Sequence, residues 1–377
     1  MSVWEITCYT LAIGYACLIL IYFVGWVFIK EQKASKNIET QNAFTILIAA
    51  RNEEAQIAAC LNAILVQTYP KHLFEIIVLN DHSTDATAQE VLRIKALNPD
   101  LNVQLINAQE AGFTGKKNAI THGVSVAKSP YIILTDADCT RGKDWLQAID
   151  GFLQTKKSQF IYAPVYFTSS NLFESFQSLE FAGLVGIGGA AIRLKNPNMC
   201  SAANLIFSKE SFTKVGGYLD NVHMASGDDE FLLHKVFKQY PNEVHFLKDK
   251  RSIVYTSPNA SVDQLTQQRR RWVSKSTKYE NRYITAILVG AYFFNASIFF
   301  NVLAGIWLPG FAGVGLNQLL IKMTAEGLLL GSILAFFGTR RLLLLVPLVQ
   351  PFHILYVIII GVWANIQTYT WKERELK

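Results

Sequence analysis

The stretch TDADC places two acidic residues, Asp136 and Asp138, directly after the apolar, β-rich run YIILTD (Tyr131 to Asp136). Two carboxylates one residue apart at the end of a buried strand are costly to place without a partner. A hard divalent cation with oxygen ligands, Mg²⁺ or Mn²⁺, is the natural partner and would bridge them to a diphosphate. A lone DxD pattern also occurs in ordinary loops, but its place at a strand end favours a metal site.

Two earlier β-rich runs also end in polar residues. FTILIAA (Phe44–Ala50) runs into RNEE, which contains Glu53, and FEIIVLN (Phe74–Asn80) runs into DHSTD, which contains Asp81. A carboxylate at a strand end can accept the imide N–H of uracil or a ribose hydroxyl. Both stretches are also typical of helix caps and turns, and each alone fits that interpretation better.

Gly115 and Lys116 open a predicted helix between the third and fourth strands. A glycine followed by a lysine at a helix N-terminus suits phosphate binding. The spacing of Gly112 and Gly115 is not that of a Walker A loop. A solvated lysine pair, Lys116 and Lys117, is the alternative.

Two further motifs lie downstream. Asp228, Asp229 and Glu230 are successive carboxylates before a helical run, and their mutual repulsion suits a general base in an enclosed site. Capping of that helix is the alternative. QRRRW (Gln268–Trp272) offers amide and cationic donors beside an indole, which can hold a diphosphate and stack on a sugar. Its alternative is a basic patch that flanks a membrane span.

The composition narrows the class of protein. Of 377 residues, 51% are hydrophobic and only 17% are charged, which excludes disordered and collagen-like chains. The formal net charge of +6 is modest and does not indicate a nucleic-acid-binding protein. The five cysteines form no CxxC pair, so we expect them to be reduced and structural.

The apolar residues concentrate at the two ends of the chain. The segment from Cys8 to Ile29 carries no charge and is long enough to span a membrane. Lys30, Lys33 and Lys36 follow it, so the positive-inside rule predicts an integral cell-membrane protein with the middle of the chain in the cytoplasm.

Two to three further spans are expected near the C-terminus. Ile284 to Leu308 is long enough to span a membrane. Gly327 to Gly338, which follows a glycine-containing stretch, could be half of another span. Leu342 to Trp363 is a last span, interrupted by two prolines. The expected domains are an N-terminal anchor at 1–35, a cytoplasmic domain at 36–282 and a membrane region at 283–377.

The central region alternates short β-rich runs with helical patterns, which predicts βαβ units around a mostly parallel sheet. The expected strands are Phe44–Ala50, Phe74–Asn80, Asn102–Asn107 and Tyr131–Asp136. Ligands bind at the carboxyl ends of such strands, where the first acidic motifs lie. Tyr166 to Leu194 has helical periodicity. This helix could lie on the membrane surface, or it could pack in the core.

Together and in this order, the motifs resemble glycosyltransferase family 2, and within it the membrane-integrated branch of cellulose, hyaluronan, chitin and poly-N-acetylglucosamine synthases. The resemblance covers roughly Phe44 to Trp272 and rests on ARNEE, NDHSTD, GKKNA, TDADC, GDDE and QRRRW. It implies a GT-A fold, a nucleotide-sugar donor (most often a UDP-sugar) and inversion at the anomeric carbon. Asn80 and His82 stand where the family commonly has an acid and a glycine, but Asp81 is retained.

The resemblance also implies roles for single residues. Donor contacts are implied for Glu53, Asp81, Lys116, Asp136 and Asp138, the last two being the metal ligands. Asp229 matches the general base. Contacts to the diphosphate or the acceptor are implied for Asp228, Gln268, Arg271 and Trp272, and SAAN (Ser201 to Asn204) resembles a segment near the acceptor.

These roles predict a membrane-bound, inverting, metal-dependent hexosyltransferase that forms a β-linkage in polysaccharide or oligosaccharide synthesis. The alternative keeps the chemistry but adds a single sugar to a membrane lipid. A catalytically inactive sensor or scaffold is a third class, and the intact Asp136, Asp138, Asp229 and Trp272 argue against it. The sequence does not identify the sugar, the acceptor or any accessory subunit.

Overall fold

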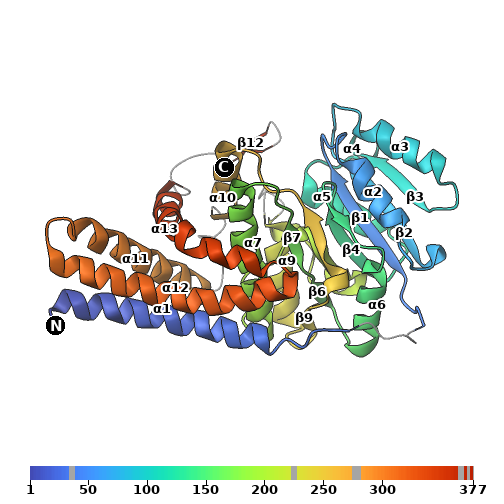
Figure 1. Ribbon diagram of the computed structural model, residues 1–377. Coiled ribbons are helices and arrows are strands. Elements are labelled where there is room, and N and C mark those ends of the chain that lie inside the picture. Colours follow the sequence, from blue (N-terminus) through green and yellow to red (C-terminus); the bar gives the residue numbers. More distant parts are fainter. Residues whose placement is uncertain (34–38, 222–226, 274–281, 364–368, 372–373, 377) are drawn as a thin grey trace. The chain divides into compact units, whose positions relative to one another are not determined.

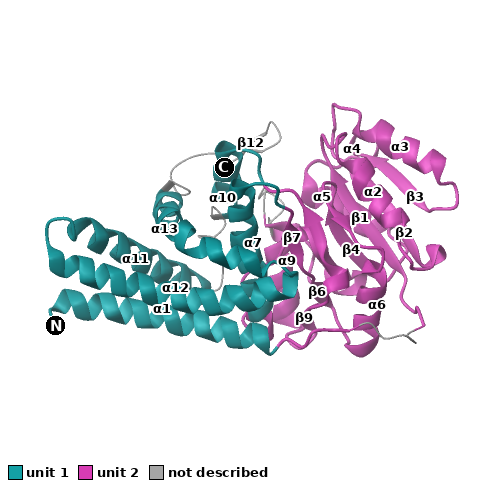
Figure 2. Cartoon of the chain, in the orientation of Figure 1, with its two compact units in different colours: residues 1–28, 169–190, 259–377 teal, residues 29–168, 191–258 magenta. Residues whose placement is uncertain are grey.

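The computed structural model describes residues 1–33, 39–221, 227–273, 282–363, 369–371 and 374–376 (Figure 1). The chain divides into two compact units (Figure 2). Unit 1 comprises Met1–Phe28, Ser169–Ala190 and Asn259–Lys377, and unit 2 comprises Ile29–Thr168 and Ala191–Pro258. This division differs from the expected central domain at 36–282, because two helical segments of that range group with the apolar helices.

Unit 2 is built around a seven-stranded sheet in the order β3-β2-β1-β4-β8-β6-β9. Its strands are β1 (Phe44–Ala50), β2 (Phe74–Asn80), β3 (Val103–Asn107), β4 (Tyr131–Asp136), β6 (Phe160–Tyr162), β8 (Leu205–Ser208) and β9 (Val244–Phe246). The first four are mutually parallel, and β8 runs antiparallel to both of its neighbours. The predicted mostly parallel sheet is therefore confirmed.

The four parallel strands are the ones that the sequence predicts, and β3 begins one residue later than expected. They read as continuous apolar runs because helices cover both faces of such a sheet. A smaller sheet, β5-β10-β7, consists of β5 (Thr140–Arg141), β10 (Val254–Thr256) and β7 (Val165–Phe167). It places Thr256 at the end of β10.

The helices of unit 2 follow the strands in alternation. They are α2 (Ile57–Leu65), α3 (Thr87–Leu97), α4 (Ala108–Ala111), α5 (Lys116–Val126), α6 (Trp145–Thr155), α8 (Lys209–Lys214) and α9 (Asp228–Gln239), with single 3₁₀ turns η1 (Lys71–Leu73), η2 (Ala202–Asn204), η3 (Leu219–Asn221) and η4 (Lys250–Ser252). Helix α5 lies very close to the sheet at Gly123, where an added Cβ would meet Leu79 at 2.9 Å and Leu47 at 3.1 Å. This contact fixes the position of α5 over β1 and β2.

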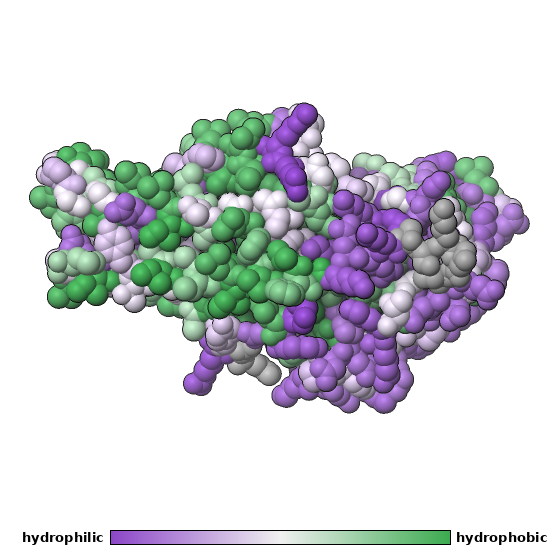
Figure 3. All heavy atoms as spheres, turned by 60° about the horizontal axis from the view of Figure 1, so that its bottom comes forward, coloured by the Kyte–Doolittle hydropathy of each residue, from purple (hydrophilic) through white to green (hydrophobic). Residues whose placement is uncertain are grey.

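Unit 1 consists mainly of long apolar helices. Its elements are α1 (Val3–Val27), most of α7 (Leu172–Arg193), α10 (Val262–Val273), α11 (Arg282–Ala304), α12 (Pro309–Phe337), η6 (Arg340–Leu345), α13 (Val346–Trp363), β11 (Tyr369–Trp371) and β12 (Arg374–Leu376). Apolar residues dominate the surface over this helical bundle (Figure 3).

Five helices in the described part of the chain are long and apolar enough to cross a membrane. They are Val3–Val27, Leu172–Arg193, Arg282–Ala304, Pro309–Phe337 and Arg340–Val362. The expected N-terminal helix and three C-terminal helices are thus present. The other one, α7, differs from these four because most of its apolar stretch is buried, and its Gly183 and Gly186 lie directly against α12.

The glycine-containing stretch after Pro309 is helical, which corrects the expected half span. Helix α12 runs unbroken from Pro309 to Phe337. Proline is tolerated in the first turn, where a backbone N–H has no intrahelical partner. Gly315 allows close packing on α11, since an added Cβ would lie 3.2 Å from Asn301 and Val302.

A buried ion pair lies among the apolar helices. Lys322 is fully buried, and its Nζ lies 2.5 Å from Oε1 of Glu326, one turn further along α12. The Tyr15 hydroxyl of α1 donates to the same carboxylate at 2.5 Å, and the Gln350 amide of α13 donates to its other oxygen. These contacts join three helices through one carboxylate.

We expect Lys322→Met to lower the stability by about 3–5 kcal/mol, because the Glu326 carboxylate stays buried without its cation. Adding Glu326→Gln removes the buried unpaired charge, while the one amide oxygen can still accept from either Tyr15 or Gln350. The double variant should therefore melt above the single variant in detergent, and Lys95→Met on exposed α3 should change little. A double variant that melts no higher than Lys322→Met would contradict this explanation.

Candidate active site

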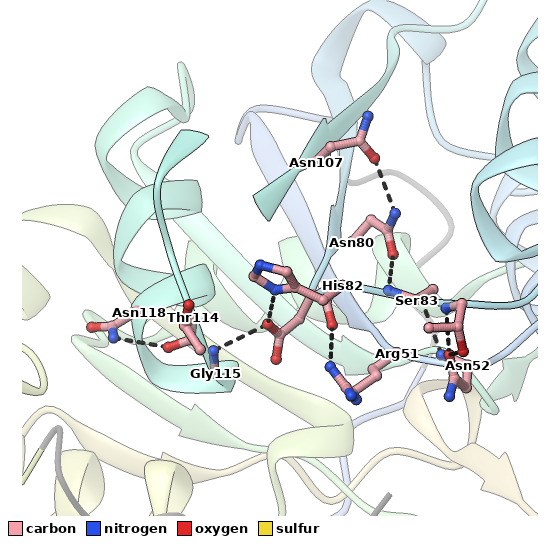
Figure 4. Close-up of polar contacts among 11 residues, drawn as sticks. Arg51, Asn52, Asn80, His82, Ser83, Asn107, Thr114, Gly115 and Asn118 are labelled. Carbon is pink, nitrogen blue, oxygen red and sulfur yellow. Dashed lines mark hydrogen bonds and ion pairs between the residues drawn. The ribbon is translucent and has the colours of Figure 1, made fainter. Parts of the chain in front are cut away.

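The loops that follow β1 and β2 are joined by hydrogen bonds. Asn52 Oδ1 accepts from the Thr84 N–H at 2.9 Å, and the Asn52 N–H donates to Ser83 Oγ at 3.1 Å (Figure 4). Arg51 Nη1 donates to the Asp81 carbonyl at 3.0 Å. Asn52 adopts a left-handed φ of 52°, which asparagine tolerates better than most residues. The two loops therefore form one edge of the site.

Glu53 lies in this edge and is partly exposed. Its backbone N–H donates to Thr87 Oγ1 at 2.8 Å, and the Glu54 N–H donates to Asp85 Oδ2 at 3.0 Å. The residue that precedes α2, Gln56, makes no side-chain cap. These backbone bonds connect the two loops, and the N-cap of α2 is Gln56 rather than Asn52, which corrects the helix-capping interpretation.

Asp81 is buried where β2 ends. Its Oδ1 accepts from the Gly115 N–H at 3.1 Å and lies 3.1 Å from His82 Nδ1. Gly115 has a φ of +84°, which side-chain-bearing residues rarely adopt. A glycine is therefore needed to bring the N-terminus of α5 to the end of β2.

Lys116 connects three elements. Its Nζ lies 2.8 Å from Asp136 Oδ1 at the end of β4 and 3.4 Å from Asp228 Oδ2 at the start of α9. Burial of the ammonium lowers the pKa of Lys116, but the Asp136, Asp228 and Asp229 carboxylates raise it well above its usual range. Lys116 is thus a fixed cation, which corrects the solvated-lysine alternative.

Asp138 is the most enclosed of the candidate metal ligands. Its Oδ2 accepts from Thr256 Oγ1 at 3.0 Å, and its Oδ1 lies 3.5 Å from Cys139 Sγ. Burial raises the pKa of Asp138 and the Asp136 carboxylate raises it further, while the bonds from Thr256 and Cys139 lower it only in part. A bound cation would offset both of the effects that disfavour the charged form.

The donor set fits a cation that is shared with a substrate. No three His, Cys, Asp or Glu side chains among the described residues form a complete metal-binding group. Asp136 and Asp138 therefore supply at most two protein ligands. Mg²⁺ is usually held by one or two carboxylates together with substrate phosphates and water, so the remaining positions suit a diphosphate.

Asp228 and Asp229 begin α9 directly after Gly227. Gly227, with a φ of +84°, occupies the N-cap position and makes no side-chain cap. The Asp228 carboxylate faces Lys116, and Asp229 Oδ1 accepts from the Glu230 N–H at 2.9 Å. The interpretation of Asp228 or Asp229 as the N-cap residue is therefore wrong.

Gln268, Arg271 and Trp272 lie on α10, which belongs to unit 1. Gln268 Oε1 accepts from Asn259 Nδ2 at 2.9 Å. The Trp272 ring lies 4.3 Å from the guanidinium of Arg269, a residue to which the sequence motif assigns no role. The structure thus groups this motif within unit 1 and the acidic strand ends within unit 2.

Asn204, in the segment SAAN, has a structural role. It accepts from Trp145 Nε1 at 3.2 Å and donates to the carbonyls of Pro164 and Ser252 at 2.8 Å each. Its amide is fully buried and joins separate segments of unit 2. These bonds use the amide for packing, which differs from the expected acceptor contact.

Two residues beside the carboxylates of the site, Thr256 and Tyr218, were not expected from the sequence. Thr256 holds Asp138, but β10 is too short to show a periodic pattern. Tyr218 is buried with no hydrogen-bond partner for its hydroxyl among the described residues, and burial together with Asp228 and Asp229 raises its pKa. A tyrosine before a turn carries no sequence signal for either property.

Residues 45–216 match the family model described as Glycosyl transferase family 2. The chain carries a family 2 glycosyltransferase domain. The matched range contains Glu53, Asp81, Lys116, Asp136 and Asp138. The acidic pair at the start of α9 and the motif on α10 follow it in the sequence.

Curated relatives match the same part of the chain. Poly-beta-1,6-N-acetyl-D-glucosamine synthase of Staphylococcus aureus (strain COL) is 29% identical over 189 residues, which are 49% of this chain and 44% of the relative. Glycosyltransferase AglE of Haloferax volcanii is 22% identical over 191 residues, which are 49% of this chain and 58% of the relative. The matched segment thus spans less than half of the synthase.

The fold of the family 2 domain and its flanking helices is also found in a solved structure. Mannosyltransferase PcManGT from Pyrobaculum calidifontis, in complex with GDP-Man and Mn²⁺, has a TM-score of 0.57 at 16% sequence identity. The similarity covers 93% of this chain and 98% of that one. The expected GT-A fold is confirmed.

We expect Asp138→Asn to weaken Mn²⁺ binding in the presence of UDP, because Asp138 is the more enclosed of the two candidate ligands. Thr256→Val should weaken binding at least about tenfold, because the Thr256 hydroxyl donates to the Asp138 carboxylate and orients it. Electron paramagnetic resonance of free Mn²⁺ measures both. The exposed Asp220→Asn serves as the control, and equal affinities in all four proteins would contradict the assignment.

Proposed function

We propose that the chain is a membrane-bound, inverting, metal-dependent glycosyltransferase that transfers a sugar from a UDP-sugar to a hydroxyl acceptor. The product would carry a β-linkage, and the role would be polysaccharide or oligosaccharide synthesis. The observation that carries the proposal is the arrangement around Lys116 of carboxylates from the end of β4 and the start of α9. The match of residues 45–216 to the family 2 model also supports the proposal.

The donor would bind along the carboxyl ends of β1, β2 and β4. Glu53 and Asp81 would contact the nucleoside, and Lys116 would contact the nucleotide side. Asp136 and Asp138 would hold Mg²⁺ or Mn²⁺, which when bound neutralises negative charge on the diphosphate. The two carboxylates would then face the cation, and the Lys116 ammonium would face the diphosphate.

Asp229 would act as the general base. Its carboxylate would take the proton of the acceptor hydroxyl as the hydroxyl oxygen bonds to C1 of the sugar, and the bond from C1 to the diphosphate oxygen breaks on the opposite face. An α-linked donor therefore gives a β-linked product. Asp228, Gln268, Arg271 and Trp272 would contact the leaving diphosphate and the acceptor.

The apolar helices would place the enzyme in the cell membrane. Helix α1 would be the anchor at 1–35, the catalytic domain would occupy 36–282, and α11, α12 and α13 would form the membrane region at 283–377. Lys30 and Lys33 follow α1 directly, so the positive-inside rule puts the catalytic domain in the cytoplasm. The acceptor would be a carbohydrate or a lipid.

Single-sugar transfer to a membrane lipid is the second candidate function. It is favoured by the small number of apolar helices after α10, which are three in the described part of the chain. A growing polysaccharide needs a route across the membrane, whereas a lipid acceptor stays within it. The size of the product distinguishes the two.

The test is nucleotide release by the purified protein in detergent, with native lipid extract as the acceptor source. The panel contains UDP-sugars and GDP-sugars, each with Mn²⁺, Mg²⁺ or a chelator. We expect release from a UDP-sugar with a metal ion, and a loss of at least about 10²-fold in Asp229→Asn because the proton acceptor is removed. Asp220→Asn, an exposed acid on η3, is the matched control.

Sizing of the radiolabelled product completes the experiment. A ladder of oligosaccharides supports the synthase, and one discrete lipid-linked product supports the alternative. Release that survives in Asp229→Asn would show that Asp229 is not the general base. Release from GDP-sugars alone would overturn the choice of donor.

A further inference from the structure

Helix α10 is held on α7 by polar side chains within unit 1. Gln177 Oε1 accepts from the Asn259 backbone N–H at 2.9 Å and from its Nδ2 at 3.1 Å, and Gln177 Nε2 donates to the Asn259 carbonyl at 2.9 Å. Asn259 in turn donates to Gln268 at 2.9 Å. Gln177 is fully buried, so this contact fixes the start of the segment that leads into α10.

A second contact lies one turn further along α7. Glu180 Oε2 accepts from Arg269 Nη2 at 2.8 Å, and the two side chains are only 15% and 2% exposed. The Arg269 guanidinium lies 4.3 Å from the Trp272 ring centroid, because residues three apart share a helix face. Phe181 of α7 approaches the same indole, with ring centroids 6.0 Å apart.

Arg269 depends on Glu180 for its polar contacts. Nε and Nη1 of Arg269 are buried with no hydrogen-bond partner in the described part of the chain. The Glu180 carboxylate and the Trp272 ring therefore stabilise the guanidinium in its buried position. A buried arginine that loses its carboxylate is strongly destabilised and turns toward solvent where it can. Such a movement would remove the group that packs on Trp272.

We propose that Glu180 is a positioning residue for the acceptor: through Arg269 it fixes one face of Trp272 and so sets the orientation in which the indole meets the acceptor sugar. This inference rests on the proposed function of Trp272. It also restricts that function, because the ring face covered by Arg269 is not available to a sugar. The acceptor must use the remaining surface of the indole.

The experiment compares Glu180→Gln, Glu180→Asp and the control Glu174→Gln, a partly exposed acid in the first turn of the same helix. All variants are full-length proteins in detergent. The kinetic probe is a β-linked 4-methylumbelliferyl glycoside of the donated sugar, and the binding probe is UDP with Mn²⁺. The third readout is acrylamide quenching of Trp272 emission, obtained by difference from the matching Trp272→Phe protein.

For Glu180→Gln we expect an acceptor KM raised about tenfold, with kcat and UDP affinity changed less than about twofold, because a small misplacement of one contact suffices. Trp272 should also become more accessible to acrylamide. Glu180→Asp should restore part of the KM, and Glu174→Gln should match the wild type. A KM that stays unchanged, or a parallel loss of UDP affinity, would overturn the proposal.

The quenching readout separates this proposal from the proposed function. A wild-type protein that transfers sugar from no donor would contradict the enzyme assignment. Quenching would still test the contact chain from Glu180 to Trp272. Unchanged quenching in Glu180→Gln would overturn that chain whatever the reaction is.

Discussion

The charge balance around the Lys116 ammonium is the interaction on which the rest of unit 2 depends. Carboxylates at a strand end and at a helix start repel one another, and the ammonium between Asp136 and Asp228 offsets this repulsion. Lys116 can reach them because Gly115 turns the chain beside Asp81 and because Gly123 lets α5 lie close to the sheet. The position of the Lys116 side chain therefore depends on Gly115 and Gly123.

The same charge balance explains how a donor could be accepted. Lys116 pairs with Asp136 but not with Asp138, whose pKa is raised by burial and by the nearby Asp136 carboxylate. In the proposed donor complex a divalent cation would add positive charge beside Asp138, and a diphosphate would supply further oxygen ligands. We therefore expect the cation and the diphosphate to bind together.

Much of unit 2 could be predicted from the sequence, because its physics is local. The four parallel strands are apolar runs buried on both faces. The acidic residues follow these runs directly in the sequence, so their place at the strand ends could be predicted. The contacts that were missed depend on segments far apart in the chain, such as Thr256 with Asp138 and Glu180 with Arg269. Helix α12 was expected only in part, as a half span at Gly327–Gly338. Its earlier half contains Pro309 and several glycines, of which Gly315 permits close packing on α11.

If the carboxyl ends of the strands bind a cation and a diphosphate as one complex, the two must lie in contact. Electron–nuclear double resonance of Mn²⁺ added with UDP to the purified protein measures that contact. We expect a phosphorus hyperfine coupling, because the diphosphate oxygens would be ligands of the bound Mn²⁺. Protein-bound Mn²⁺ without phosphorus coupling, or UDP binding that is indifferent to Mn²⁺, would contradict this proposal.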